Sequence, residues 1–196
     1  MAIDLSASMN YTYRQSLTKL DYCICLAAAL SYLMIAQQDP VGLVTFDTKL
    51  GLAFHLASGQ LPTILSHLTR LKVAGKTDLA GSVMQLAAML RHRSLVMLFS
   101  DLLTEEEPML SLVAQLRHAG HDVIIFHVLD EASNAFPFRD DATRDPETGA
   151  SESVRASRRR PNIIRRLKPF VNDSNANSTK VVSTLSYRLI PARSPT

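Results

Sequence analysis

Oxygen-bearing side chains occupy alternate positions directly after the first hydrophobic residues of the chain. Asp4, Ser6 and Ser8 form the pattern D-x-S-x-S, and this spacing lets an extended loop aim three oxygens at one point. Thr77, in the loop KVAGKTD, and Asp101, just after the apolar run SLVMLF, would bring the donors to five. Oxygen-only ligation suits a hard cation such as Mg²⁺, with Mn²⁺ or Ca²⁺ as alternatives. The residues therefore predict a metal site made of these five side chains.

The chemistry expected of such a site is binding rather than catalysis. Two carboxylates balance a divalent charge, and hydroxyl donors are neutral and weak, so the metal would accept a carboxylate from outside. A Mg²⁺-dependent phosphatase or phosphotransferase of the haloacid dehalogenase type is the alternative, but it needs an acid–base Asp two positions after a nucleophilic Asp. Ser6 stands at that position. A plainer interpretation is that Ser6 and Ser8 only form a turn after a strand.

The elements that must position these residues alternate along the chain. Continuous apolar strands indicate a parallel sheet covered on both faces, and a two-residue turn after the second strand indicates one antiparallel hairpin. This pattern predicts an α/β, doubly wound, mostly parallel sheet with one antiparallel edge strand, in which ligands bind beyond the carboxyl ends of the strands. We expect strands at Met1–Ile3, Val41–Phe46, Leu50–His55, Ser94–Phe99 and Asp122–Val128, and helices at Leu17–Gln37, Leu61–Leu71, Leu79–Leu90 and Pro108–His118.

Three short motifs, DLSASM, GKTDL and FSDLL, resemble the metal-ion-dependent adhesion site of von Willebrand factor A domains. The longer stretches KLDYCICLAAALSYLMIAQQDPVGLVTFD, RSLVMLFSDLL and GHDVIIFHVLDEASNAFPF resemble a bacterial family, domain of unknown function fifty-eight, usually encoded beside MoxR-type AAA+ ATPases. The resemblance covers about residues 1–149. It implies a von Willebrand factor A-like, Rossmann-type fold, a metal held by Asp4, Ser6, Ser8, Thr77 and Asp101, and a role as an ATPase-associated adaptor that captures an Asp or Glu of a partner protein.

Both ends of the chain depart from that family. Its members carry a preceding segment and a full first strand, so this chain resembles the carboxyl-terminal part of a longer protein with its first strand truncated. Near the other end, the polar stretch Asn172–Leu185 separates RRLKPFV from YRLIP. Back-translating it with allowed codons and dropping two bases yields R-L-E-R-E-L-N-K-G-G-V-D, the helix and strand entry that the family has there. A frameshifted tail is therefore a hypothesis that the genomic DNA would test, and a truncated, non-functional gene product is a further alternative.

The net charge of +3 is unevenly distributed along the chain. Residues 1–150 hold 11 Lys and Arg against 16 Asp and Glu, a net −5, whereas residues 151–196 hold 10 against 2, a net +8. We expect a domain at 1–149 and a basic, partly helical tail at 150–196. The tail reads as a solvated surface segment rather than a nucleic-acid site. Its basic run consists of Arg155, Arg158, Arg159, Arg160, Arg165, Arg166 and Lys168.

The cellular compartment is inferred from the cysteines and the most hydrophobic segment. Cys23 and Cys25 are the only cysteines, and their spacing sends them to different sides of a helix, where we expect reduced core thiols. The apolar stretch Tyr22–Ala36 falls short of the about 20 residues that a bilayer span needs, so a buried helix is expected. The sequence therefore predicts a cytoplasmic protein without a membrane span in this chain.

Overall fold

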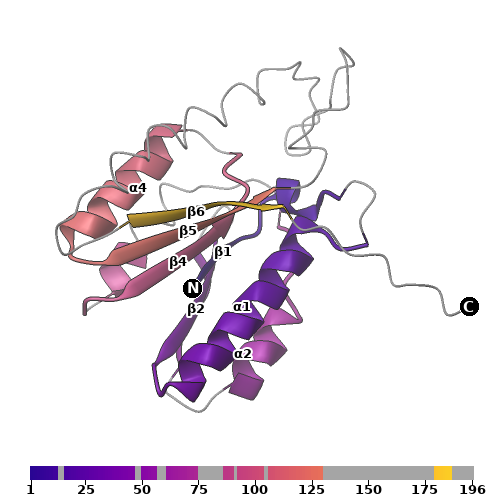
Figure 1. Ribbon diagram of the computed structural model, residues 1–196, viewed down its shortest axis with the longest axis horizontal. Helices are drawn as coiled ribbons and strands as arrows, with labels where there is room; N and C mark the ends of the chain where they lie inside the picture. Colours follow the sequence, from indigo (N-terminus) through magenta and orange to yellow (C-terminus); the bar gives the residue numbers. More distant parts are fainter. Residues whose placement is uncertain are drawn as a thin grey trace, which may run out of the picture.

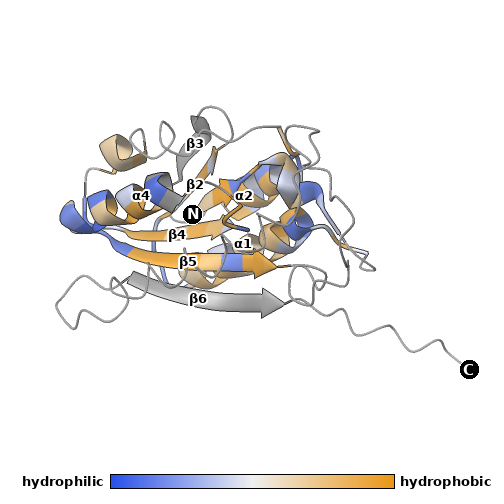
Figure 2. Cartoon of the chain, turned by 90° about the horizontal axis from the view of Figure 1, so that it is seen from above, coloured by the Kyte–Doolittle hydropathy of each residue, from blue (hydrophilic) through white to orange (hydrophobic). Residues whose placement is uncertain are grey.

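A single sheet organises the part of the chain that the structure, a computed structural model, describes: residues 1–12, 16–46, 50–56, 61–74, 86–90, 92–103, 106–129 and 179–186. Within these residues the sheet has six strands in the order β3-β2-β1-β4-β5-β6 (Figure 1; β3 is labelled in Figure 2). The strands are β1 (Ala2–Asp4), β2 (Val41–Phe46), β3 (Leu50–Leu56), β4 (Leu95–Ser100), β5 (Asp122–Leu129) and β6 (Thr179–Ser186). The helices are η1 (Ala7–Asn10), α1 (Lys19–Ala36), α2 (Leu61–Leu68) and α4 (Glu106–His118), and residues 86–89 are also helical.

All neighbouring strands are parallel except β2 and β3, which form an antiparallel hairpin. The expected doubly wound, mostly parallel sheet with one antiparallel edge strand is therefore confirmed. β1 lies in the middle, between β2 and β4, so the winding direction reverses beside it. Such a reversal is where doubly wound sheets bind ligands, at the carboxyl ends of the strands. Here those ends carry Asp4 and Ser100.

Helices cover both faces of the sheet, α1 and α2 on one side and α4 on the other (Figure 1). Successive strand residues point to opposite faces, so Ala2 and Leu98 belong to the core cluster under α4, and Ile3 and Phe99 to the cluster under α1 and α2. β4 and β5 are hydrophobic over most of their length, as two-sided burial requires (Figure 2). β1 and β4 are thus buried over most of their length and carry polar side chains at their carboxyl ends, whereas β5 also has the buried His127 within it.

Most expected elements occur within a few residues of their predicted bounds, and one strand was not expected. All of β6 except Ser186 lies in the polar stretch Asn172–Leu185, and β6 pairs parallel to β5. The β-branched pair Val181 and Val182 was the signal that the sequence analysis overlooked. The boundary of the domain at residue 149 stays a prediction. Most of the expected helix Leu79–Leu90 lies outside the described residues.

α1 begins with a capping box in which the Thr18 hydroxyl accepts from the Asp21 N–H and the Asp21 carboxylate accepts from the Thr18 N–H. Its buried stripe faces the sheet and includes Cys23, whereas Cys25 is exposed. The two cysteines lie on different sides as expected, but the expectation that both are core thiols is wrong for Cys25. Positions 23 and 25 lie about 200° apart on a helix, so only one of them can face the core.

α1 is also the one helix among the described residues that is long and apolar enough to cross a membrane by length and composition alone. The core helix of a soluble protein and a signal sequence pass the same test. In this fold the helix packs against the sheet through Leu20, Cys23 and Ala27. The absence of a membrane span therefore stays a prediction.

Candidate metal site

The chain turns sharply where β1 ends. The Leu5 N–H still donates to the Phe46 carbonyl at 3.0 Å, continuing the ladder to β2, and the Ser6 N–H then donates back to Asp4 Oδ1 at 2.8 Å. This Asx-type turn directs the following hydroxyls inward. Ser6 Oγ and Ser8 Oγ lie 3.0 Å apart, and both side chains are buried. The D-x-S-x-S loop thus gathers its three polar side chains in one buried place.

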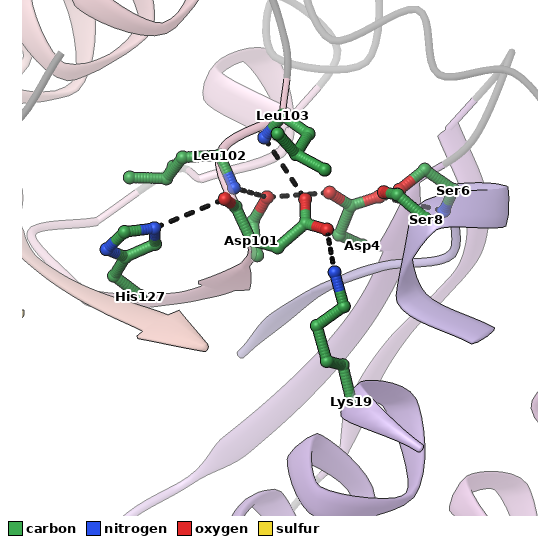
Figure 3. A network of polar contacts seen from close by, with 9 residues as sticks. Asp4, Ser6, Ser8, Lys19, Asp101, Leu102, Leu103 and His127 are labelled. Carbon is green, nitrogen blue, oxygen red and sulfur yellow. Dashed lines mark hydrogen bonds and ion pairs between the residues drawn. The ribbon is translucent and has the colours of Figure 1, made fainter. Parts of the chain in front are cut away.

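A second turn follows β4 and faces the first. Ser100 Oγ donates to Asp4 Oδ2 at 2.6 Å, and it accepts the Leu102 N–H at 3.0 Å. Leu102 adopts a left-handed backbone with φ of 54°, which costs about 1–2 kcal/mol for a residue with a side chain. Its buried side chain holds it there, and the turn directs the carboxylate of Asp101 toward the D-x-S-x-S loop (Figure 3).

Asp101 is held by several groups at once. Its Oδ1 accepts the Leu103 N–H at 3.1 Å, its carboxylate is hydrogen-bonded by the Ser8 hydroxyl, and its backbone oxygen contacts His127 Nε2 at 3.2 Å. Its Oδ2 forms an ion pair with Lys19 Nζ (Figure 3). The two loops are therefore joined into one polar network at the carboxyl edge of the sheet.

Lys19 is the member of this network that the sequence analysis missed. It occupies the first turn of α1, its side chain and that of Asp101 are only 2% and 1% exposed, and its ammonium lies 5.9 Å from the centre of the Tyr11 ring. A cation in the first turn of a helix opposes the helix dipole. That unfavourable position, at the start of a mostly apolar helix, was the signal in the sequence that could have indicated an internal partner.

The two carboxyl groups differ in their electrostatics. Burial, together with the nearby charge of Asp101, raises the pKa of Asp4 to about 6, although hydrogen bonds from Ser100 and Ser6 act in the opposite direction. Burial acts to raise the pKa of Asp101 as well, but the charge and hydrogen bond of Lys19 hold that pKa below its usual value. Asp101 therefore carries its negative charge over a wider pH range than Asp4 does.

Of the five predicted ligands, the structure brings together Asp4, Ser6, Ser8 and Asp101. Thr77 lies outside the described residues. The described chain leads toward it as far as Ala74, whose N–H donates to the Leu5 carbonyl at 2.8 Å. The segment before Thr77 thus reaches the D-x-S-x-S loop.

The donor set fits a hard divalent cation. An octahedron with Mg–O bonds of about 2.0–2.1 Å places neighbouring ligand oxygens roughly 2.9 Å apart. The Ser6 and Ser8 hydroxyls, hydrogen-bonded to each other at 3.0 Å, lie close enough to occupy neighbouring positions of such an octahedron. Within the described ranges, no cluster of three or more His, Cys, Asp and Glu side chains forms a metal site of another kind. Two hydroxyls and two carboxylates make this edge a candidate magnesium site, with Lys19 as a cation already present.

The comparisons with known proteins agree with the fold. The family described as "Protein of unknown function DUF58" matches residues 1–171. No curated protein matches the sequence. An aerotolerance-related membrane protein from Bacteroides fragilis NCTC 9343, solved with multiple mutations to serines, is 14% identical with a TM-score of 0.61, covering 92% of this chain and 88% of that one.

Two further solved structures are similar to parts or most of the chain. The conserved hypothetical protein BatB from Bacteroides thetaiotaomicron is 13% identical with a TM-score of 0.60, covering 92% of this chain and 87% of that one. The SpRpn10 VWA domain is 15% identical, covering 63% of this chain and 70% of that one, but its TM-score of 0.44 makes it too loose a likeness to build on. At such identities the aerotolerance-related protein and BatB show a fold shared with this chain. Nothing about the activity or the partner of this chain follows from them.

Proposed function

We propose that this chain, which belongs to the family of proteins of unknown function DUF58, is a non-enzymatic protein-binding module whose divalent cation captures a carboxylate of a partner protein. One observation carries the proposal. Asp4, Ser6, Ser8 and Asp101, drawn from two separate strand ends, converge in one buried hydrogen-bonded network at the switch point of the sheet.

The hydroxyls of Ser6 and Ser8 would hold the cation, with the carboxylates of Asp4 and Asp101 supplying negative charge and Thr77 as the further predicted donor. When bound, Mg²⁺, or Mn²⁺ or Ca²⁺ in its place, supplies a Lewis-acidic position that accepts an oxygen of an Asp or Glu from outside.

The chain's own residues prepare this site. Ser100 orients the carboxylate of Asp4, and Asp4 in turn fixes the Ser6 N–H and so the start of the hydroxyl-bearing loop. Burial removes these groups from water, which strengthens every charge interaction among them. The hydroxyl at Ser6, where a phosphatase of the haloacid dehalogenase type has a second carboxylate, supports binding over catalysis.

The partner proposed from the family resemblance is a MoxR-type AAA+ ATPase, for which this protein would serve as a cytoplasmic adaptor. Capture of such an ATPase in Mg²⁺ and its loss in chelator is the expected result. Capture that is equal in both conditions would contradict a metal-mediated contact.

Metal binding is tested by calorimetry with Mn²⁺ and Mg²⁺. The variant Ser8→Ala removes one proposed ligand and should weaken binding by about tenfold or more. Ser94→Ala is the matched control, because it removes a hydroxyl that donates to the His92 carbonyl just before β4, at the end of the strand opposite the site. If both variants bind metal as the wild type does, the proposed site is wrong.

Enzymatic activity has its own test. Hydrolysis of p-nitrophenyl phosphate by the wild type in Mg²⁺ that disappears in Asp4→Asn would favour the phosphatase alternative over a binding module. The expected result is no turnover in either protein.

A further inference from the structure

Lys19 is the largest fully buried polar side chain at the candidate metal site, and the proposed function does not use it. Its ammonium is held between the carboxylate of Asp101 and the ring of Tyr11. Burying a charge is costly unless it is paired. The pairing partner here is one of the four described residues proposed to hold the metal, so a protein cation and a divalent cation compete for the same carboxylate.

The competition changes the net formal charge of the site. Among the described buried residues of the network, Asp4 and Asp101 are each negative and Lys19 is positive, a net charge of −1. A divalent cation would bring the site to +1, and a carboxylate from outside would return it to zero. Without Lys19 the divalent cation alone would neutralise the site.

We propose that Lys19 is an internal counter-cation that weakens divalent metal binding until an anionic ligand binds as well. The inference rests on the proposed function and adds a regulatory feature to it. Two cations within a few ångströms repel each other in a poorly solvated site, and an arriving carboxylate relieves that repulsion. Metal and carboxylate then strengthen each other's binding by the same factor.

Lys19 is well placed to exert this control because it is fixed by its helix. The Thr18 and Asp21 capping box sets the start of α1, and the Lys19 N–H contacts the Tyr11 carbonyl at 3.4 Å. The start of α1 is therefore held against Tyr11, which directly follows η1 and the D-x-S-x-S loop.

The test is Mn²⁺ binding measured by calorimetry on the wild type and Lys19→Met, in sodium acetate and in sodium chloride of equal ionic strength. We expect Lys19→Met to bind Mn²⁺ at least about tenfold more tightly in chloride. Acetate should strengthen Mn²⁺ binding to the wild type severalfold and to Lys19→Met much less. Equal affinity of the two proteins in chloride would overturn the inference.

The pattern of results separates this inference from the proposed function. If the wild type and Lys19→Met bind equally and Ser8→Ala weakens binding, the metal site stands and the role of Lys19 fails. If only Lys19→Met binds, the role of Lys19 stands and metal-dependent function of the wild type fails. If neither binds, both fail.

Loss of the ion pair could prevent Lys19→Met from folding, and Mg²⁺ gives a second measurement. A divalent ion that replaces the missing cation should raise the melting temperature of Lys19→Met more than that of the wild type, and no difference would count against the inference. If the variant does not fold even with Mg²⁺, the ¹⁵Nζ signal of Lys19 in the wild type decides the matter. A shift on addition of Mg²⁺ supports the competition, and an unchanged signal while metal binds overturns it.

Discussion

The two ends of the central strands β4 and β5 carry ion pairs of opposite kinds. At the amino end, Arg93 and Asp122 meet at 3.3 Å with their side chains 59% and 32% exposed. At the carboxyl end, Lys19 and Asp101 are almost completely buried. Water and salt screen the first pair, so it contributes little to stability, whereas the second has lost its hydration on both partners.

The two ends of the sheet therefore differ in whether their paired charges are in contact with water. A buried ion pair is often no more stabilising than well-packed apolar side chains of the same volume. Stability alone therefore gives no reason for a buried ion pair beside Asp4 and the Ser6 and Ser8 hydroxyls, whereas the binding role proposed above gives one. The amino end has no comparable network among the described residues.

The largest expected effect comes from breaking the buried pair on its acidic side. Asp101→Ala leaves the Lys19 ammonium buried without its counter-charge and should lower the free energy of unfolding by about 3–5 kcal/mol. The matched change at the amino end, Asp122→Ala, should cost less than about 1 kcal/mol. Urea unfolding measures the free energy of unfolding of both variants. Equal losses would mean that the two ion pairs do not differ in their contribution to stability.

The next effect is the pH dependence set by Asp4. Its pKa of about 6 in the folded protein lies above the value of 3.8 for an unperturbed carboxyl group, so the folded state holds this proton more tightly than the unfolded state does. The stabilisation from that proton is complete below about pH 4 and is lost as the pH rises through 6, a change of about 3 kcal/mol.

Asp4→Asn removes this titration, so the variant should gain stability relative to the wild type between pH 4 and pH 7. Unfolding in urea at a series of pH values gives the difference. A difference that does not change over this range would contradict the raised pKa. Asp101, whose pKa is held below its usual value, stays ionised over this pH range in both proteins.

A smaller effect is expected from Ser100, which joins the two turns. Ser100→Ala removes the hydrogen bond to Asp4 and leaves the Leu102 N–H without its acceptor, at a cost of about 1–3 kcal/mol. It should also raise the pKa of Asp4 further. Thermal unfolding at neutral pH, with Ser94→Ala as the control serine, tests the loss; a loss no greater than that of the control would mean that the turn does not depend on this hydroxyl.

The smallest effect belongs to the exposed pair. Arg93→Ala should change stability by less than about 1 kcal/mol at low salt and by almost nothing in 1 M NaCl. Salt should leave the cost of Asp101→Ala nearly unchanged, because ions do not reach a buried pair. Similar salt dependence for both variants would show that the carboxyl edge is solvated after all.

The local features of this protein were predictable from its sequence. Continuous apolar runs indicated β4 and β5, and the polar residues that follow β1 and β4 indicated where oxygen donors would gather. The D-x-S-x-S spacing predicted that Asp4, Ser6 and Ser8 would share one turn. Each of these inferences depends on residues that are near neighbours along the chain or on the rule that parallel strands end at one edge.

The contacts that distinguish the site were decided by tertiary structure. Lys19 and Asp101 are 82 residues apart, and Ser100 and Asp4 are 96 apart. Hydrophobic periodicity indicates which face of an element is buried, but it does not indicate which distant polar group a buried charge will meet, because that depends on how α1 crosses the edge of the sheet. For the same reason the pKa of Asp4 and that of Asp101 shift in opposite directions, although the sequence presents both as aspartates at strand ends.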